Sequence, residues 1–134
     1  MPGVLEGGCQ CGRVRYRIAG DPVGLAVCHC QSCQRQSGSA FGMSLAVPED
    51  SFRVLTGELK TFVMRCESGR LKECVFCPEC GCRIYHSTGD AVVSVKAGTL
   101  DDTSRLDPRE HYWTAFKQAW VPIPAQSPCF ADDG

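Results

Sequence analysis

The chain has 134 residues, of which 43% are hydrophobic, and its formal net charge at pH 7 is -1. This length can bury one modest hydrophobic core but not two large ones. A charge this close to zero, with no basic run, argues against a nucleic-acid-binding stripe, and no apolar stretch is long enough to span a bilayer.

The side-chain pattern predicts a mostly β fold. RVRYRI, residues 13–18, alternates arginine with valine, tyrosine and isoleucine, which is the period-two pattern of a half-buried strand. One short helical turn is expected at residues 32–36. The segments 59–65 and 70–76 would pair as a hairpin around the turn-like ESG. The other predicted strands are 41–47, 52–55, 83–86 and 91–98.

The last third of the chain has a less regular pattern. Residues 101–110 read as a polar loop, and HYWTAFKQAW at 111–120 fits either a strand or a short helix. The end of the chain is rich in proline and polar residues. We therefore expect one domain over residues 1–122 and a loose C-terminal tail over residues 123–134.

Eleven cysteines are many for a chain of this length. Seven of them fall in three clusters with the spacing of metal ligands: Cys9 and Cys11; Cys28, Cys30 and Cys33; Cys77 and Cys80. A disulfide scaffold is disfavoured because the count is odd and because cysteines this close bridge only with strain. The opening MPGVLEGGCQCG also lacks the cationic and apolar segments of a secretory signal. We therefore expect a cytoplasmic protein whose reduced thiols bind metal.

The clusters offer two, three and two ligands. A structural zinc ion takes four ligands in a closed tetrahedron, whereas a catalytic zinc ion takes three protein ligands and leaves one position open. The two pairs would therefore make one closed site, and the triplet would make a site with an open position. Spacing alone leaves other arrangements possible. A third cysteine of the triplet could stay free, Cys82 or His29 could complete a second closed site, or the cysteines could hold an iron–sulfur cluster. The four-cysteine spacings of common ferredoxins are absent, which disfavours the cluster.

Glycines follow two of these ligands directly. Gly12 comes after Cys11, and Gly81 comes after Cys80. A chain must turn sharply after a ligating thiolate so that its amides point at the sulfur, and glycine permits that turn. This pattern is typical of zinc knuckles.

Other polar residues have two interpretations each. His29 stands between two cysteines of the triplet, where it could face solvent or form a simple hydrogen bond, or else shuttle protons. Arg13, Arg15 and Arg17 lie on one face of their strand. That face could simply be solvated, or it could bind the carboxylates of a peptide-like thiol.

Together the motifs resemble those of the glutathione-dependent formaldehyde-activating family, which also includes a domain of centromere protein V. The resemblance covers roughly residues 3–122. The motifs that carry it are G-G-C-Q-C-G, V-x-Y, C-H-C-x-x-C followed by Q-S-G-S-A-F, F-C-P-E-C-G, A-G-T-L-D at 97–101, and a closing H-Y-W…W.

The resemblance implies a β-tent fold, in which small twisted antiparallel sheets are clipped together by zinc. It implies two zinc ions. The structural ion would be held by Cys9, Cys11, Cys77 and Cys80, and the ion of the catalytic centre by Cys28, Cys30 and Cys33. The founding activity of the family is the condensation of formaldehyde with glutathione to S-hydroxymethylglutathione, classed as a carbon–sulfur lyase reaction. The chain is shorter than the founding enzyme and resembles the compact branch of the family.

We therefore expect a zinc-dependent carbon–sulfur lyase-like enzyme. Its substrates would be thiol adducts, of the glutathione type, of formaldehyde or another small aldehyde, with no nucleic-acid or membrane partner. The alternative is a non-enzymatic zinc module that binds a protein or nucleic acid, as the centromere relative suggests.

Overall fold

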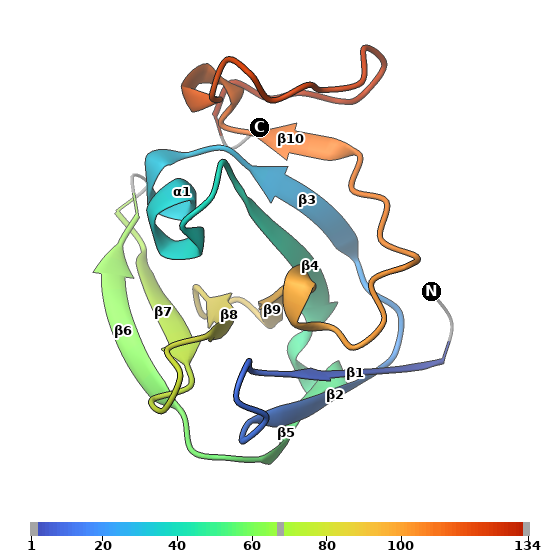
Figure 1. The fold of residues 1–134 in the computed structure, drawn as a ribbon, viewed down its shortest axis with the longest axis vertical. Coiled ribbons are helices and arrows are strands. Elements are labelled where there is room, and N and C mark those ends of the chain that lie inside the picture. The colour runs from blue at the N-terminus through green and yellow to red at the C-terminus, as the bar shows by residue number, and fades with distance from the viewer. Residues whose placement is uncertain (1–2, 67–68, 133–134) are drawn as a thin grey trace. The chain divides into compact units, whose positions relative to one another are not determined.

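A computed structural model of the chain describes residues 3–66 and 69–132 (Figure 1). The predicted ESG turn falls largely on residues 67–68, which lie outside the described residues. The mostly β fold is confirmed: the described part of the chain holds ten strands, one α-helix and three short 3-10 helices. It forms two compact units. The first comprises Met1–Gly24 and Leu45–Arg105, and the second comprises Leu25–Ser44 and Leu106–Gly134. The single domain expected over residues 1–122 stays a prediction.

The first unit begins with a three-stranded antiparallel sheet in the order β1-β2-β5. Its strands are β1 (Val4–Gly8), β2 (Arg15–Ala19) and β5 (Phe52–Thr56). In β2, Tyr16 and Ile18 are fully buried and Arg17 is exposed, so the alternation predicted from RVRYRI is confirmed. The strand starts two residues later than expected because Val14 belongs to the loop around Cys9.

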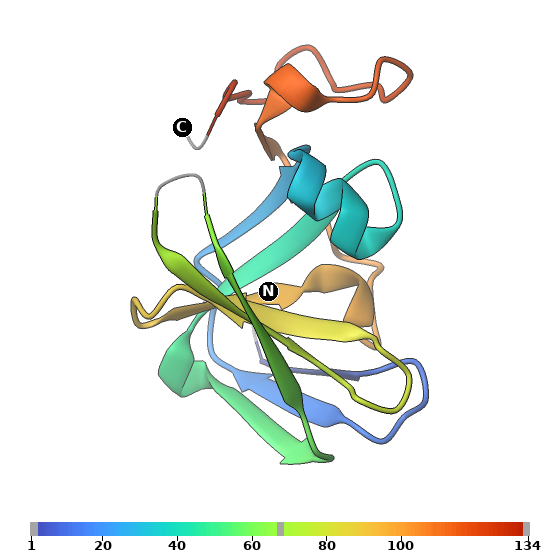
Figure 2. The same ribbon diagram turned by 90° about the vertical axis from the view of Figure 1, so that its left-hand side faces the viewer.

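Four further strands of the first unit follow one another in the order β9-β8-β7-β6 and pair antiparallel. Their hairpin β6–β7 is strongly twisted (Figure 2). The elements are β6 (Lys60–Arg65), β7 (Leu71–Phe76), β8 (Arg83–Ser87) and β9 (Val92–Lys96), with the 3-10 helices η1 (Glu49–Ser51) and η2 (Ala97–Thr99). The sequence predicted all four strands to within two residues.

The second unit is built around the segment that carries the cysteine triplet. Strand β3 lies between β10 and the first residues of β4. The elements are β3 (Gly24–Cys28), α1 (Gln31–Ser37), β4 (Gly42–Pro48), β10 (Glu110–Tyr112) and η3 (Thr114–Phe116). Strand β10 runs parallel to β3, unlike the antiparallel pairs of the first unit, because the long stretch of chain between them allows a crossover.

The ambiguous segment HYWTAFKQAW contains both of the structures considered for it. Its first residues belong to β10, and η3 follows after Trp113, whose φ of 56° breaks the strand. Backbone hydrogen bonds join this region to the end of the chain, from Phe130 to His111 (2.8 Å) and from Trp113 to Asp132 (3.0 Å). Among the described residues, no helix has the length and apolar character needed to cross a membrane.

Candidate metal centres

The first unit brings two of the predicted cysteine pairs together. The Sγ atoms of Cys9, Cys11, Cys77 and Cys80 all lie within 4.8 Å of one another. Cys9 follows β1 and Cys77 follows β7, so the group joins two distant parts of the sequence. The Cys9–Cys11 and Cys11–Cys77 sulfur distances are 3.5 and 3.8 Å. Zinc–sulfur bonds of about 2.3 Å give a tetrahedron with edges of about 3.8 Å, so this donor set fits a four-coordinate zinc ion.

The backbone turns that position these thiols are those expected from the glycines. Gly12 has a φ of 83° and Gly81 a φ of 78°, conformations that favour glycine over any other residue. The Gly12 N–H donates to the Cys9 carbonyl at 3.1 Å, and the Gly81 N–H to the Cys77 carbonyl at 2.8 Å. The sharp turns predicted after Cys11 and Cys80 are confirmed.

The surroundings of these thiols favour negative charge on the Cys9 sulfur and disfavour it on the Cys11 sulfur. Burial alone would raise the pKa of Cys9, but the N–H of Val14, 3.2 Å from its sulfur, and the neighbouring thiols lower it to about 6. The Arg13 amide lowers the pKa of Cys11, yet burial and the three nearby thiols outweigh it and raise the pKa to about 12. Thiolates this close repel one another, so the four thiols ionise together only beside a cation.

We expect Gly8→Ala to destabilise the first unit. A Cβ on Gly8 would overlap the Val14 carbonyl oxygen and come within 3.0 Å of Arg15 Cδ. The Val14 backbone would have to move, and with it the N–H that faces the Cys9 sulfur. The free energy of unfolding should fall by about 1–3 kcal/mol, measured by denaturant unfolding of the zinc-loaded protein. The strand residue Gly24 is the matched control, since nothing lies within 4 Å of a Cβ added there. Equal stability of Gly8→Ala and Gly24→Ala would contradict the expectation.

The second unit brings together the cysteine triplet. The Sγ atoms of Cys28, Cys30 and Cys33 also lie within 4.8 Å of one another. Cys28 ends β3, Cys30 is the N-cap of α1, and Cys33 lies in the first turn of that helix. The Cys30 sulfur accepts the Cys33 N–H at 3.3 Å, as a capping serine oxygen would. The side chains of Cys30 and Cys33 raise the pKa of Cys28, because the three thiols cannot all ionise side by side without a cation.

Neither residue considered as a fourth ligand for the triplet belongs to it. Among the described residues, the structure groups no other cysteine, histidine or carboxylate with these three sulfurs. The Cys82 thiol points to the Arg83 carbonyl oxygen, at 3.7 Å, and burial raises its pKa. The arrangement is therefore one group of four thiols and one of three.

His29 is turned toward another histidine. Its ring is fully buried, and its Nε2 lies 3.0 Å from Nδ1 of His111. Burial lowers the pKa of both rings, and for His29 the nearby His111 and Lys117 lower it further. Two neutral imidazoles can share one hydrogen bond, so the pair joins the triplet loop to β10. The hydrogen-bonding interpretation of His29 is confirmed, and the solvent-facing one is wrong.

A glutamine of α1, not recognised from the sequence, joins the same loop to the chain after β10. The Gln34 Nε2 donates to the carbonyl oxygens of His29 (2.8 Å) and Phe116 (3.0 Å). Its Oε1 accepts a hydrogen bond from Gln118 Nε2 at 3.0 Å. The repeated glutamines of CQSCQRQ gave no signal for this, because Phe116 and Gln118 are 82 and 84 residues away.

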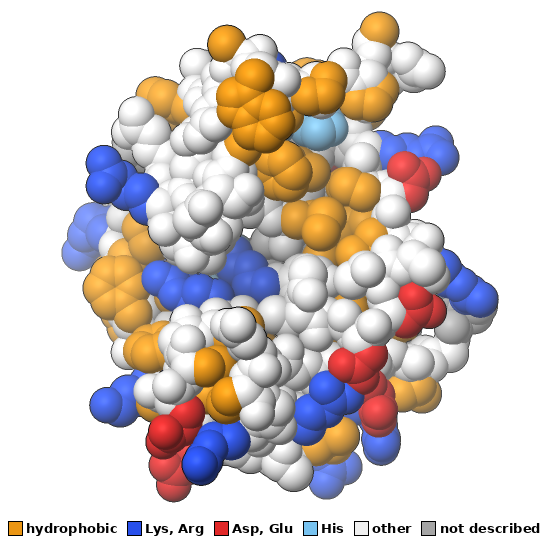
Figure 3. Space-filling view, in the orientation of Figure 1, with side chains coloured by type: hydrophobic (Ala, Val, Ile, Leu, Met, Phe, Trp, Pro, Cys, Tyr) orange, Lys and Arg blue, Asp and Glu red, His pale blue; other side chains and the backbone are white. Residues whose placement is uncertain are grey.

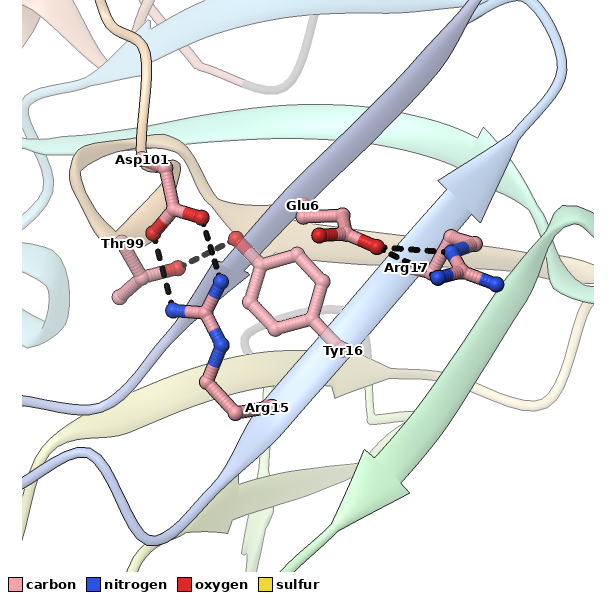
Figure 4. A network of polar contacts seen from close by, with 6 residues as sticks. All are labelled: Glu6, Arg15, Tyr16, Arg17, Thr99 and Asp101. Carbon is pink, nitrogen blue, oxygen red and sulfur yellow. Dashed lines mark hydrogen bonds and ion pairs between the residues drawn. The ribbon is translucent and has the colours of Figure 1, made fainter.

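Arg13, Arg15 and Arg17 were considered as a patch that binds substrate carboxylates. Two of them, Arg15 and Arg17, already pair with carboxylates of the first unit (Figure 4). Arg15 forms a two-pronged pair with Asp101, in which Nη1 and Oδ1 are 2.9 Å apart, and Arg17 Nη2 lies 2.7 Å from Glu6 Oε2. Between them, the buried Tyr16 shares a hydrogen bond with Thr99. Because Asp101 and Glu6 pair with these guanidinium groups, this face of β2 is a network of ion pairs within the unit.

Comparison with known proteins identifies the family. The family model described as glutathione-dependent formaldehyde-activating enzyme matches residues 4–116. The chain belongs to this family. A Halomonas elongata protein whose name contains the same description is 29% identical over 138 residues, covering 96% of this chain and 87% of its own.

A solved structure supports the fold. The crystal structure of a Rhodobacter sphaeroides protein superposes with a TM-score of 0.56 at 19% identity, covering 78% of this chain and 92% of that one. At this identity the similarity shows the fold alone.

Proposed function

We propose that this family member is a zinc-dependent carbon–sulfur lyase-like enzyme with two zinc ions. The structural ion would be held by the four thiols Cys9, Cys11, Cys77 and Cys80. The second would be held by the catalytic triplet Cys28, Cys30 and Cys33. The single observation that carries the proposal is the difference between the groups, four sulfurs in one and three in the other.

The triplet suits a soft sulfur ligand. A zinc ion held by three thiolates would have its fourth coordination position open, and a substrate thiol would bind there as its thiolate. The chain's own contribution is rigid placement of the three sulfurs. Cys28 is fixed by the strand β3, and Cys30 and Cys33 by the first turn of α1.

The proposed reaction joins a thiol such as glutathione to formaldehyde or another small aldehyde. The thiol loses its proton, and its sulfur forms a bond with the carbonyl carbon. The π electron pair of the carbonyl moves to the oxygen, which takes up a proton, giving a hemithioacetal. The reverse reaction breaks the carbon–sulfur bond, which is the lyase direction.

The charge distribution supports small-molecule partners rather than nucleic acid. Figure 3 shows the Lys and Arg side chains of the face it draws in separate groups, some of them beside Asp and Glu. A continuous basic stripe with interleaved aromatics is what nucleic-acid binding would favour. Thiols that bind metal must stay reduced, which fits the cytoplasm as the compartment of this protein.

A screen of thiols against aldehydes tests this function. Zinc-loaded protein is mixed with glutathione, cysteine or a simple alkyl thiol, each with formaldehyde or a larger aldehyde, and hemithioacetal formation is followed by NMR. We expect at least one pair to react faster than without protein, and Cys28→Ser to remove the acceleration. If no pair is accelerated, the proposed activity is wrong, and the non-enzymatic binding module becomes the better account.

A further inference from the structure

One side-chain nitrogen in the helix that carries Cys33 is buried without a hydrogen-bond partner in the described part of the chain. The side-chain nitrogen Nε2 of Gln36 is buried and has no hydrogen-bond partner among the described residues. A buried amide without a partner costs about 1–3 kcal/mol, so such groups are rare in folded proteins and need an explanation. Gln36 is the first residue of the motif Q-S-G-S-A-F, whose residue types alone indicate no chemical role.

Helix geometry places this amide on the same side as a cysteine of the triplet. Cys33 and Gln36 are three residues apart in α1, so their side chains lie on one face of the helix. Both face the start of β4. A Cβ built on Gly42 would lie 3.0 Å from Gln36 Nε2 and 3.4 Å from Cys33 Sγ. The Gln36 nitrogen and the Cys33 sulfur therefore both lie close to the position that a Cβ on Gly42 would take. The missing side chain at Gly42 lets them approach it.

The side-chain amide of Gln36 donates no hydrogen bond to the Cys33 thiol. Gln36 Nε2 has no bond to Cys33 or to any other described group, although this nitrogen and the Cys33 sulfur both lie within 3.4 Å of the position that a Cβ on Gly42 would take. A donor that is buried, fixed and unused next to a reacting centre is poised for a group that arrives with the substrate. In the reaction proposed above, the substrate thiol would bind beside these cysteines, and the carbonyl oxygen would lie next to the carbon–sulfur bond that its sulfur forms.

We propose that Gln36 is a catalytic residue that donates a hydrogen bond from Nε2 to the oxygen of the aldehyde. This inference rests on the proposed function. When the sulfur–carbon bond forms, the electron pair of the carbonyl moves to this oxygen, and the amide stabilises the negative charge until a proton arrives. A preorganised donor of this kind favours the transition state over the bound aldehyde. Gly42 has a positioning role, because any side chain there would push the amide away.

The test compares Gln36→Met with Gln31→Met in the full zinc-loaded chain. Methionine keeps the length of the side chain and removes the donor, and Gln31 is an exposed glutamine on the same helix. We expect Gln36→Met to lower kcat/KM for the aldehyde by about 100-fold, the typical effect of losing one oxyanion donor. The response of the cobalt-substituted protein to glutathione alone should not change, because the amide contacts the oxygen and not the sulfur. Gln31→Met should match the wild type in both measurements.

A second readout does not depend on turnover. The side-chain amide signal of Gln36 in a ¹⁵N NMR spectrum is identified by its loss in Gln36→Met. Glutathione alone should leave this signal nearly unmoved, and glutathione with formaldehyde should shift it. Gln36→Asn shortens the side chain by one methylene without adding an atom beside Cys33. It should weaken that shift while retaining both metal ions, which keeps the inference testable if Gln36→Met folds poorly.

Three results would overturn the inference, and they are distinguishable. An unchanged kcat/KM in Gln36→Met means that the amide has no part in the reaction. A cobalt spectrum altered in Gln36→Met before any substrate is added means that the amide acts on the metal ligands instead. If the wild-type protein neither responds to glutathione nor forms a hemithioacetal, the proposed function itself fails, and the inference fails with it.

Discussion

Cys77→Ser should abolish stable folding of the first unit. The Cys77 side chain is fully buried, and its thiol is one of the four that join the end of β1 to the end of β7. A structural zinc ion contributes on the order of 10 kcal/mol to small domains at neutral pH. That is comparable to the whole stability of a typical domain, about 5–15 kcal/mol, so losing one of four ligands removes most of the margin. The measurement is thermal unfolding together with the zinc content of the purified protein.

Cys74→Ser is the matched control for this prediction. Cys74 lies in β7, three residues before Cys77, is equally buried, and belongs to neither thiol group. It should lose only the packing of one sulfur atom and keep both metal ions. A Cys77→Ser protein that melts cooperatively near the wild-type temperature would contradict the structural role of the four-thiol group.

Cys30→Ser should have the opposite effect, leaving the protein folded but without the second metal ion. Serine is a favoured N-cap residue, so its hydroxyl can accept the Cys33 N–H that the Cys30 sulfur accepts now. The four-thiol group lies in the other unit and keeps all its ligands. Zinc content should fall from two ions per chain to one, the melting temperature should stay within a few degrees, and thiol-dependent activity should be lost.

The exposed Cys129, which lies in the same unit as Cys30, provides the control. Cys129→Ser should retain both metal ions and full activity. If Cys30→Ser instead loses both metal ions and unfolds as Cys77→Ser does, the division into a structural and a reactive group is wrong.

Local signals in the sequence explain which parts of this fold could be predicted. The ligand clusters are visible because their members lie within five residues of one another, and the glycines after Cys11 and Cys80 mark the turns. The strand around Tyr16 is visible because burial alternates along it. The strand β1 was missed because its end is two glycines, and β3 because GLAVC is a short apolar run without alternation.

The remaining features depend on contacts that no local pattern encodes. Arg15 and Asp101 are 86 residues apart, and His29 and His111 are 82 apart. Gln36 could be placed on the face of Cys33 from its spacing, but its importance depends on a glycine of β4 that approaches the same point. The sequence therefore predicted which thiols come together, and tertiary structure was needed to show what surrounds them.

The most direct test of the central claim is a glutathione titration of the cobalt-substituted protein. Cobalt(II) reports the number of bound thiolates through its sulfur-to-metal charge-transfer absorption. If Cys28, Cys30 and Cys33 leave one position open, glutathione should add a fourth sulfur and strengthen this absorption, and Cys30→Ser should abolish the response. The affinity should fall as the pH drops below neutral, because protons compete with the metal for the thiolate. A spectrum that stays unchanged across millimolar glutathione would show that the three-thiol site takes no thiol and would contradict the proposed chemistry.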